Sequence, residues 1–247
     1  MGRPLVAVML AAAAAGALAS PSAAPARVAL SNGSIPHWTL VRPPVAASHL
    51  IAYVRPGGTV AVRTRPFGPT MERLGSTTPF GSERALSLVK RLRGRWLAVT
   101  SPELGNGRLG WIDARAGGLR YARTRLEIVV DLSRRQLLLR SGSSVLRRVR
   151  VGIGRPGSPT PTGRFAVTDK LPGPTYSAYY GCCILALSAT QPNLPAGWTG
   201  GNRIAIHGTP DASDFGAAVS AGCVHAPDDA LRYLMRTVPL GTPVVIR

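Results

Sequence analysis

IAIHGTPDASDFGAAVSAGCVHAP, residues 204–227, holds two of the chain's four histidines and one of its three cysteines. In this stretch Cys223 follows a run of small residues, and His207 stands upstream at the end of a short apolar run. A thiol attacks as the thiolate, and an imidazole within reach can take its proton. The pattern therefore predicts nucleophilic chemistry at the sulfur, provided that the fold brings the two side chains together.

Local features of the same stretch favour this interpretation. Gly222 permits a tight turn and a close approach of substrate, and backbone N–H groups in such a turn can hold an oxyanion. A helix beginning near Pro227 could direct its positive end toward the turn and favour the thiolate. His207 ends a predicted strand and is followed by Gly208, as expected for a base that reaches over a loop.

Other interpretations of these residues remain open. A lone cysteine is usually a small buried hydrophobe, and a single histidine on a strand is more often structural. Cys223, His207 and His225 could also be partial zinc ligands, but the chain has no CxxC pair, and the adjacent Cys182 and Cys183 can hardly both point into one site. We therefore predict no metal and no organic cofactor.

An odd number of cysteines implies a free thiol or pairing between molecules. If Cys182 and Cys183 bond to each other, or stay buried in a strand, Cys223 is the free thiol.

The C-terminal half has the pattern of a β-rich domain. Residues 126–132 and 136–139 flank a turn and predict a hairpin. Further strands are expected within 145–153 and 161–167, and at 184–187, 203–206 and 243–246. One helix is predicted, at 227–237, where Leu231, Leu234, Met235 and Val238 repeat at helical spacing. The aromatic segment 176–183 could line a substrate groove or belong to the core.

The N-terminal half predicts a small all-β module. Short apolar runs at 51–54, 60–62, 96–99 and 110–112 alternate with Gly/Pro turns. VAVRTRPFGP (60–69) and RWLAVTSPELGNGRLGWIDA (95–114) resemble a bacterial SH3-like domain, over about residues 48–116. The alternative is an irregular β extension that packs on its neighbour.

A second resemblance is carried by the cysteine stretch itself. IHGT (206–209) and SAGCV (220–224) resemble the active-site signature of L,D-transpeptidase catalytic domains of the YkuD type. GRPGSPTPTGRF (154–165) resembles another segment of that family, and the likeness extends over about 125–247. It implies a mainly β catalytic domain with one flanking helix.

The resemblance also assigns roles to residues. It makes Cys223 the nucleophile and His207 the base and acid. The backbone around Gly222 and Cys223 would hold the oxyanion, while Ser220 and Gly208 would shape the loop.

One position departs from the family pattern. His225 stands where the family usually has an arginine that orients the cysteine loop and adds positive charge near the oxyanion. A histidine can donate a hydrogen bond but is mostly neutral near pH 7 if unperturbed. The departure predicts weaker or more pH-dependent activity, and it leaves open a catalytically decayed wall-binding protein.

The activity implied by the resemblance is acyl transfer between peptidoglycan stem peptides. The Cys223 thiolate would attack a donor tetrapeptide before its terminal D-Ala, and an acceptor amine would resolve the thioester into a 3→3 cross-link. Water as the acceptor would make the protein an L,D-carboxypeptidase instead.

Charge and the first residues indicate an exported protein. Residues 1–24 have the layout of a signal peptide, with an uncleaved anchor as the alternative, and 25–47 that of a Pro/Ala-rich tether. The net charge of +19 predicts attraction to polyanions. For a monomer exported to the periplasm or cell wall, these are anionic wall polymers; nucleic acid is not expected because no nucleic-acid-binding motif is present.

Overall fold

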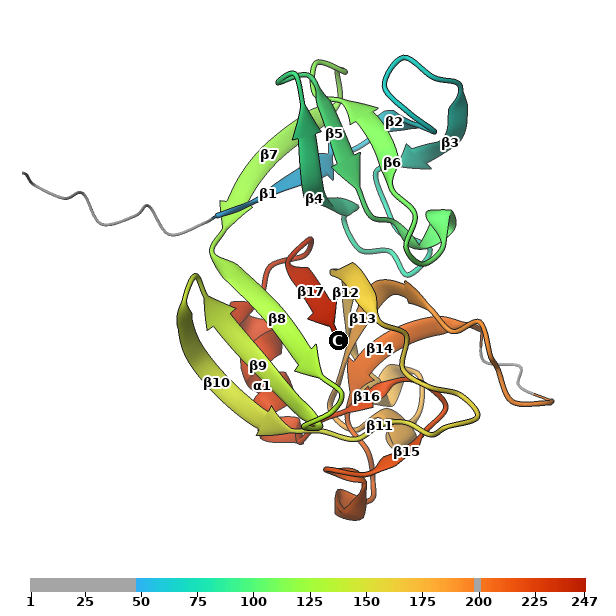
Figure 1. Ribbon diagram of the computed structural model, residues 1–247, viewed down its shortest axis with the longest axis vertical. Coiled ribbons are helices and arrows are strands. Elements are labelled where there is room, and N and C mark those ends of the chain that lie inside the picture. The colour runs from blue at the N-terminus through green and yellow to red at the C-terminus, as the bar shows by residue number, and fades with distance from the viewer. Residues whose placement is uncertain (1–47, 198–200) are drawn as a thin grey trace, which may run out of the picture. The chain divides into compact units, whose positions relative to one another are not determined.

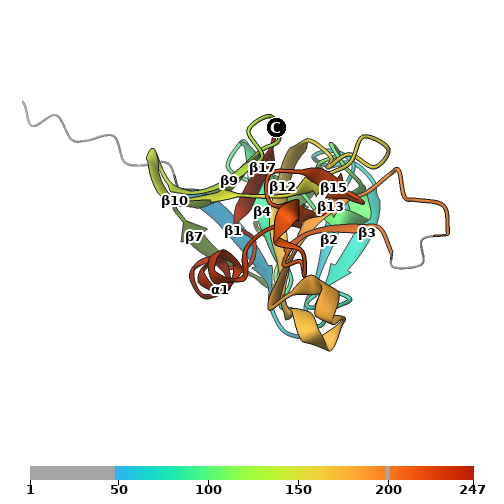
Figure 2. The ribbon, with the colours of Figure 1, turned by 90° about the horizontal axis from the view of Figure 1, so that it is seen from below.

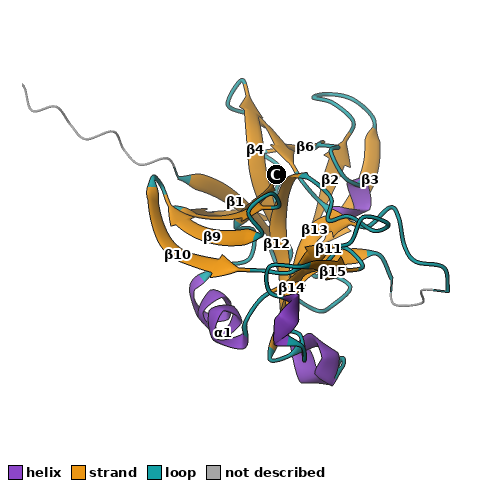
Figure 3. Cartoon of the chain, turned by 60° about the horizontal axis from the view of Figure 1, so that its bottom comes forward, coloured by secondary structure: helices purple, strands orange, loops and turns teal. Residues whose placement is uncertain are grey.

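The computed structural model of this chain describes residues 48–197 and 201–247. The predicted signal peptide and tether lie outside the described residues. Strands dominate the described chain, as Figure 3 shows, and α1 (Asp228–Thr237) is the one α-helix found there. The prediction of a mainly β protein with one flanking helix is confirmed. No helix in the described part of the chain is both long enough and apolar enough to cross a bilayer.

The N-terminal half forms a seven-stranded sheet (Figure 1). Its strands are β1 (His49–Val54), β2 (Thr59–Arg63), β3 (Thr70–Gly75), β4 (Ala85–Leu92), β5 (Trp96–Val99), β6 (Gly110–Asp113) and β7 (Leu119–Thr124). They lie in the order β3-β2-β6-β5-β4-β1-β7. The four apolar runs predicted as strands are β1, β2, β5 and β6. The SH3-like assignment of this module stays a prediction.

The C-terminal half forms an eight-stranded sheet with the order β10-β9-β8-β17-β12-β13-β14-β16. Its strands are β8 (Leu126–Asp131), β9 (Gln136–Ser141), β10 (Ser144–Arg150), β12 (Gly163–Pro172), β13 (Cys183–Thr190), β14 (Arg203–His207), β16 (Val224–His225) and β17 (Pro243–Ile246). A small parallel pair joins β11 (Ile153–Gly154) to β15 (Ala218–Ser220). The predicted hairpin is confirmed as the antiparallel pair β8–β9.

The two ends of this half meet in the middle of the sheet. β17 pairs in parallel with β8 and antiparallel with β12, so the last strand of the chain lies between two earlier ones. Side chains of β8, β12, β13, β14 and β17 fill one apolar core. The four described 3-10 helices lie in loops, at Pro102–Leu104, Gly173–Thr175, Ala178–Tyr180 and Ala212–Asp214.

The helix α1 packs beside the eight-stranded sheet (Figure 2). It follows Pro227, and Leu231 and Leu234 are buried at the spacing that the sequence predicted. Its C-terminal end is held from β12, because Lys170 Nζ donates to the carbonyls of Met235 and Val238, each at 2.9 Å. An ammonium at this end satisfies carbonyls that the helix leaves without partners.

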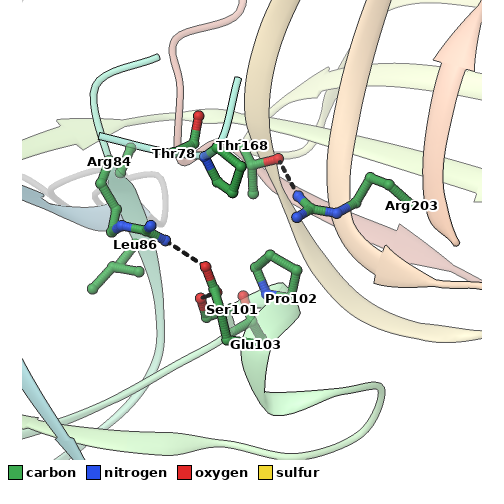
Figure 4. A pocket seen from close by; sticks show the side chains of 11 residues that line it. Thr78, Arg84, Leu86, Ser101, Pro102, Glu103, Thr168 and Arg203 are labelled. Carbon is green, nitrogen blue, oxygen red and sulfur yellow. Dashed lines mark hydrogen bonds and ion pairs between the residues drawn. The ribbon is translucent and has the colours of Figure 1, made fainter. Parts of the chain in front are cut away.

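The two sheets touch through polar and apolar contacts within one compact unit. Thr78 Oγ1 donates to the buried carboxylate of Asp169, and the Tyr53 hydroxyl donates to the carbonyl of Leu240 at 3.0 Å. A small cavity of about 10 Å³ lies beside the first of these contacts, and Figure 4 shows side chains that line it. In it Arg203 of β14 donates to Thr168 at 3.2 Å.

Candidate active site

A cavity of about 610 Å³ opens at the β14–β16 edge of the eight-stranded sheet and is lined by four of the six predicted site residues, whereas Gly208 and Gly222 lie outside its lining. Its wall is largely apolar and aromatic, with Tyr176, Tyr179 and Tyr180 contributed by the segment that the sequence left undecided between groove and core. Cys183, at the end of that segment, belongs to the core. Phe80 of the N-terminal half also lines the cavity. The cavity is further lined by Ser220, Cys223, His207, His225 and Arg155.

Two neighbouring strands place the reactive side chains together. β14 and β16 run parallel, and their register sets His207 beside His225 and Ile206 beside Val224. Because side chains alternate along a strand, Cys223 projects to the same side as His225 two residues later. The two imidazole rings are 4.8 Å apart between centroids. The structure therefore brings the cysteine and both histidines to one cavity.

His207 is buried and oriented by its own loop. Its side chain is 2% exposed, and its Nδ1 lies 2.6 Å from the carbonyl oxygen of Gly208. A carbonyl only accepts, so Nδ1 carries the hydrogen and Nε2 of the neutral ring is left as an acceptor. Burial lowers the pKa of His207 to about 4, with a smaller contribution from His225. His207 is therefore a neutral base at physiological pH.

Gly208 is required by close packing. A Cβ at this position would lie 2.7 Å from both the Gly181 Cα and an Asp228 carboxylate oxygen. The Gly208 N–H also donates to the Tyr180 carbonyl at 2.9 Å. The loop after β14 thus presses against the Tyr179–Tyr180 segment, which fixes the carbonyl that orients His207. This agrees with the loop-shaping role that the resemblance gives to Gly208.

Cys223 is a free, partly exposed cysteine with a protonated thiol. Burial raises its pKa to about 11, which a backbone hydrogen bond from Ala205 only partly offsets. The sequence instead favoured a thiolate stabilised by the start of the helix. In the structure the first-turn carboxylate of Asp228 accepts from the amide of Cys182 rather than from the cysteine turn. Desolvation dominates, so the resting pair is a thiol and a neutral imidazole.

The turn before the sulfur is held by Ser220. Its Oγ accepts from the Gly222 N–H at 3.0 Å and donates to the Cys223 carbonyl at 2.6 Å. Because the Gly222 amide is already bonded, the amide of Cys223 is the turn donor that has no protein acceptor among the described residues.

Gly222 itself has a φ of +121°, and a Cβ there would lie 2.1 Å from Gln191 Nε2. Gln191 in turn donates to the carbonyls of Pro159 and Ala221, each at 3.0 Å. The buried amide thus ties the cysteine turn to the neighbouring loop.

His225 has a carboxylate partner that the sequence did not reveal. Its Nδ1 donates to Asp214 Oδ2 at 2.7 Å, and the Thr209 hydroxyl donates to the same oxygen at 2.6 Å. The His225 side chain is 2% exposed, and its backbone forms a bridge with Gly152. The ring is therefore held through Nδ1, and the backbone that carries it is held by Gly152.

Cys182 and Cys183 form a disulfide with each other. The odd cysteine count is thereby resolved within the chain, and Cys223 keeps its thiol. The disulfide directly follows Tyr179 and Tyr180, whose rings contact His207 at centroid distances of 6.0 and 4.8 Å. It therefore lies beside the wall of the cavity. Across residues 48–197 and 201–247, no group of three or more His, Cys, Asp or Glu side chains is arranged to hold a metal ion.

A comparison with protein-family models matches the region that carries this site. Residues 125–246 match the YkuD family, the L,D-transpeptidase catalytic domain. All of the predicted site residues fall within this matched region. The N-terminal sheet lies outside it.

Curated relatives match over part of the chain. YqjB of Bacillus subtilis, whose name assigns it to the L,D-transpeptidases, is 34% identical over 99 residues, which cover 39% of this chain and 56% of YqjB. YkuD of the same organism, named likewise, is 29% identical over 121 residues, covering 48% of this chain and 64% of YkuD. The chain thus spans between half and two thirds of the length of these two relatives. Together with the family match, these relatives support the L,D-transpeptidase family for residues 125–246 of this chain, at modest sequence identity.

Among solved structures, an L,D-transpeptidase from Mycobacterium smegmatis aligns with a TM-score of 0.40 and 19% identity. The alignment covers 67% of this chain and 89% of that one.

Three residues at the site could not have been chosen from the sequence. Asp214 lies inside the quoted stretch between the two histidines, where a single acidic residue in a polar loop is unremarkable. Gln191 and Tyr179 lie in other segments, and only the fold brings them to the cavity. The one available signal was the aromatic character of 176–183.

Proposed function

We propose that this protein is an exported cysteine L,D-transpeptidase that forms 3→3 cross-links between peptidoglycan stem peptides through an acyl-enzyme at Cys223. The observation that carries the proposal is the free thiol of Cys223 in one cavity with a neutral His207 whose Nδ1 donates to Gly208. The match of residues 125–246 to the YkuD family supports the same reaction class.

The geometry suits a mechanism that begins from neutral partners. His207 Nε2 takes the thiol proton as the sulfur attacks the donor carbonyl, so charge develops only when substrate is present. The amide of Cys223 is placed to donate to the oxyanion. The C–N bond then breaks, and His207 returns the proton to the amine of the departing D-Ala. An acceptor amine next attacks the thioester and releases the sulfur.

The cavity offers complementary chemistry to a stem peptide. Arg155 is exposed at its wall and can pair with a substrate carboxylate, while Tyr176 and Phe80 provide apolar surface. The net charge of +19 supports association with anionic wall polymers. The Cys182–Cys183 disulfide suits an oxidising compartment, which together with the N-terminal leader pattern supports export to the periplasm or cell wall.

Two measurements test the proposal. Intact mass spectrometry after incubation with a carbapenem, the β-lactam class that the family resemblance implies as an acylating agent, is expected to show one covalent adduct. The adduct should be absent from Cys223→Ala. A wild-type protein that forms no adduct would instead be a wall-binding protein with a decayed site.

Product analysis then separates the possible acceptors. With a disaccharide-tetrapeptide donor, a transpeptidase forms a dimer and releases one D-Ala for each cross-link. Release of D-Ala without a dimer, even with acceptor amine supplied, would identify an L,D-carboxypeptidase.

A further inference from the structure

The site holds two imidazoles whose Nδ1 atoms are bonded to different kinds of partner. His207 donates to the carbonyl of Gly208 at 2.6 Å, whereas His225 donates to the carboxylate of Asp214 at 2.7 Å. A carboxylate on Nδ1 stabilises the imidazolium form and holds the ring in the tautomer whose Nε2 accepts a proton. A neutral carbonyl on Nδ1 stabilises the imidazolium form much less than a carboxylate does. The two rings are therefore chemically unequal.

The other ring nitrogen of His225, Nε2, has no hydrogen-bond partner among the described residues. No protein group among residues 48–197 and 201–247 bonds Nε2 of this ring, although the side chain is only 2% exposed. The ring lines the same cavity as Cys223, and its centroid is 4.8 Å from that of His207. The free nitrogen is thus available to a molecule bound in the cavity.

The surroundings of His225 are those of a positioned proton acceptor. Its titratable neighbours are Asp214 on the loop between β14 and β15, His207 on the paired strand, Tyr179 at a centroid distance of 6.0 Å and Cys223 two residues before it. The Thr209 hydroxyl fixes Asp214 from the opposite side. Of these neighbours, Asp214 is the one in direct hydrogen-bonded contact with the ring.

Both half-reactions move a proton between the sulfur and an amine nitrogen, in opposite directions. In the first, His207 can pass the thiol proton directly to the leaving amine. In the second, an attacking amine must lose a proton, and a base works best when its affinity for that proton is matched to neutral pH. His207 has only a carbonyl on its Nδ1, whereas the Asp214 carboxylate on Nδ1 of His225 supports a proton on that ring, so His225 is the better acceptor for the amine proton.

We propose that His225, held by Asp214, is a second catalytic residue that takes the proton of the acceptor amine in the transfer step. The inference rests on the proposed transpeptidase function. The amine nitrogen bonds to the thioester carbon, the C–S bond breaks, and the amine proton passes to His225 Nε2. The same proton then returns to the sulfur, which regenerates the thiol and a neutral ring.

Separate measurement of the two steps tests this assignment. His225→Gln and Asp214→Asn are each compared with the wild type for carbapenem acylation, and for dimer formation from a disaccharide-tetrapeptide donor. We expect acylation to stay within a few-fold of the wild-type rate. Dimer formation should fall about 100-fold or more, as for other general bases, while the acyl-enzyme accumulates.

A matched control comes from the same loop. Asp211→Asn removes an exposed carboxylate but keeps an oxygen that accepts from the Ser213 amide, so both steps should be unchanged. Retained acylation shows that each variant is folded at the cysteine.

Equal losses of acylation and transfer in His225→Gln, or wild-type transfer in that variant, would overturn the second base while leaving the proposed function intact. A wild-type protein that forms neither adduct nor dimer would overturn both.

Discussion

At the scale of single residues, the cysteine turn depends on glycine for two independent reasons. Gly222 has a φ of +121°, which L side chains rarely adopt, and its missing Cβ makes room for Gln191. The same turn carries the Cys223 amide, which the proposed mechanism uses as the donor to the oxyanion. Backbone geometry and catalytic geometry therefore cannot be separated at this position.

Replacing Gly222 with alanine is expected to abolish most acylation. The new Cβ would overlap Gln191 Nε2, where the contact would be 2.1 Å, so either the turn moves or the Gln191 amide leaves its bonds to Pro159 and Ala221. We expect carbapenem acylation, followed by intact mass, to fall at least 100-fold, and the free energy of unfolding to fall by about 1–3 kcal/mol. Gly157→Ala is the control, because a Cβ there meets no atom within 4 Å. A Gly222→Ala variant that acylates normally would show that the turn is not a constraint.

The neutral thiol–imidazole pair gives a definite pH dependence. His207 has a pKa of about 4 and Cys223 one of about 11, both displaced by burial. Acylation should therefore be nearly constant from about pH 5 to pH 9. It should decrease as the pH falls through 4, because protonated His207 can no longer accept. Carbapenem acylation rates measured across pH check this. A rate that rises tenfold per unit between pH 6 and pH 8 would instead indicate a thiolate formed before substrate binds.

Cys223 and His207 could be predicted from the sequence, but their state of protonation could not. The motif fixes residue types and spacing, whereas the pKa depends on how completely the folded chain removes water. Asp214 could not be predicted either, because its role depends on a short loop folding back onto His225.

At the scale of elements, strands with strong local patterns were predictable and those set by distant partners were not. The β8–β9 hairpin and α1 follow from apolar periodicity and turn residues. β10, in the range where a strand was expected, is an exposed edge strand with three arginines and no buried residue, and the sequence did not indicate its pairing with β9. The insertion of β17 between β8 and β12 depends on contacts between the two ends of the domain, which no local pattern encodes.

The end of α1 provides a test at this scale. Lys170→Met keeps most of the side-chain volume but removes both bonds to the carbonyls of Met235 and Val238. Hydrogen bonds to charged groups contribute about 1.5–3 kcal/mol, and we expect a loss near the lower value because the ammonium also pays for partial burial. Urea denaturation measures the difference. Lys90→Met, at an exposed lysine of β4, should change the unfolding free energy by less than about 0.5 kcal/mol. Equal effects of the two substitutions would rule out the capping role.

At the scale of the whole described chain, the N-terminal sheet contributes directly to the cavity. Phe80 lines it, and its ring lies 6.3 Å from that of Tyr176 between centroids. The turn that carries Phe80 is held by Thr78, whose Oγ1 accepts from the amides of Phe80 and Ser82 at 3.3 and 3.2 Å. The same hydroxyl donates to Asp169 of β12. One side chain thus links the N-terminal sheet, the C-terminal sheet and the cavity wall.

This link depends on a carboxylate with few partners. Asp169 is fully buried, and its Oδ2 has no hydrogen-bond partner among the described residues. Removing the Thr78 hydroxyl leaves the other oxygen without its donor as well, and an unsatisfied buried polar group costs about 1–3 kcal/mol or more when it is charged. This loss of folding free energy would come from the contact between the two sheets, because Thr78 and Asp169 belong to different sheets.

Thr78→Val is therefore expected to destabilise the protein and weaken its cavity together. Because 1 kcal/mol corresponds to about 2–4 °C in a domain of this size, the Tm should fall by about 4–10 °C. Binding of a stem tetrapeptide, measured by calorimetry with Cys223→Ala as the background, should weaken as the turn carrying Phe80 loosens. Thr77→Val is the matched control, since Thr77 is the exposed neighbour of Thr78 and its side chain makes no contact with Asp169. If Thr78→Val lowered the Tm but left peptide binding unchanged, the N-terminal sheet would stabilise the domain without shaping its substrate site.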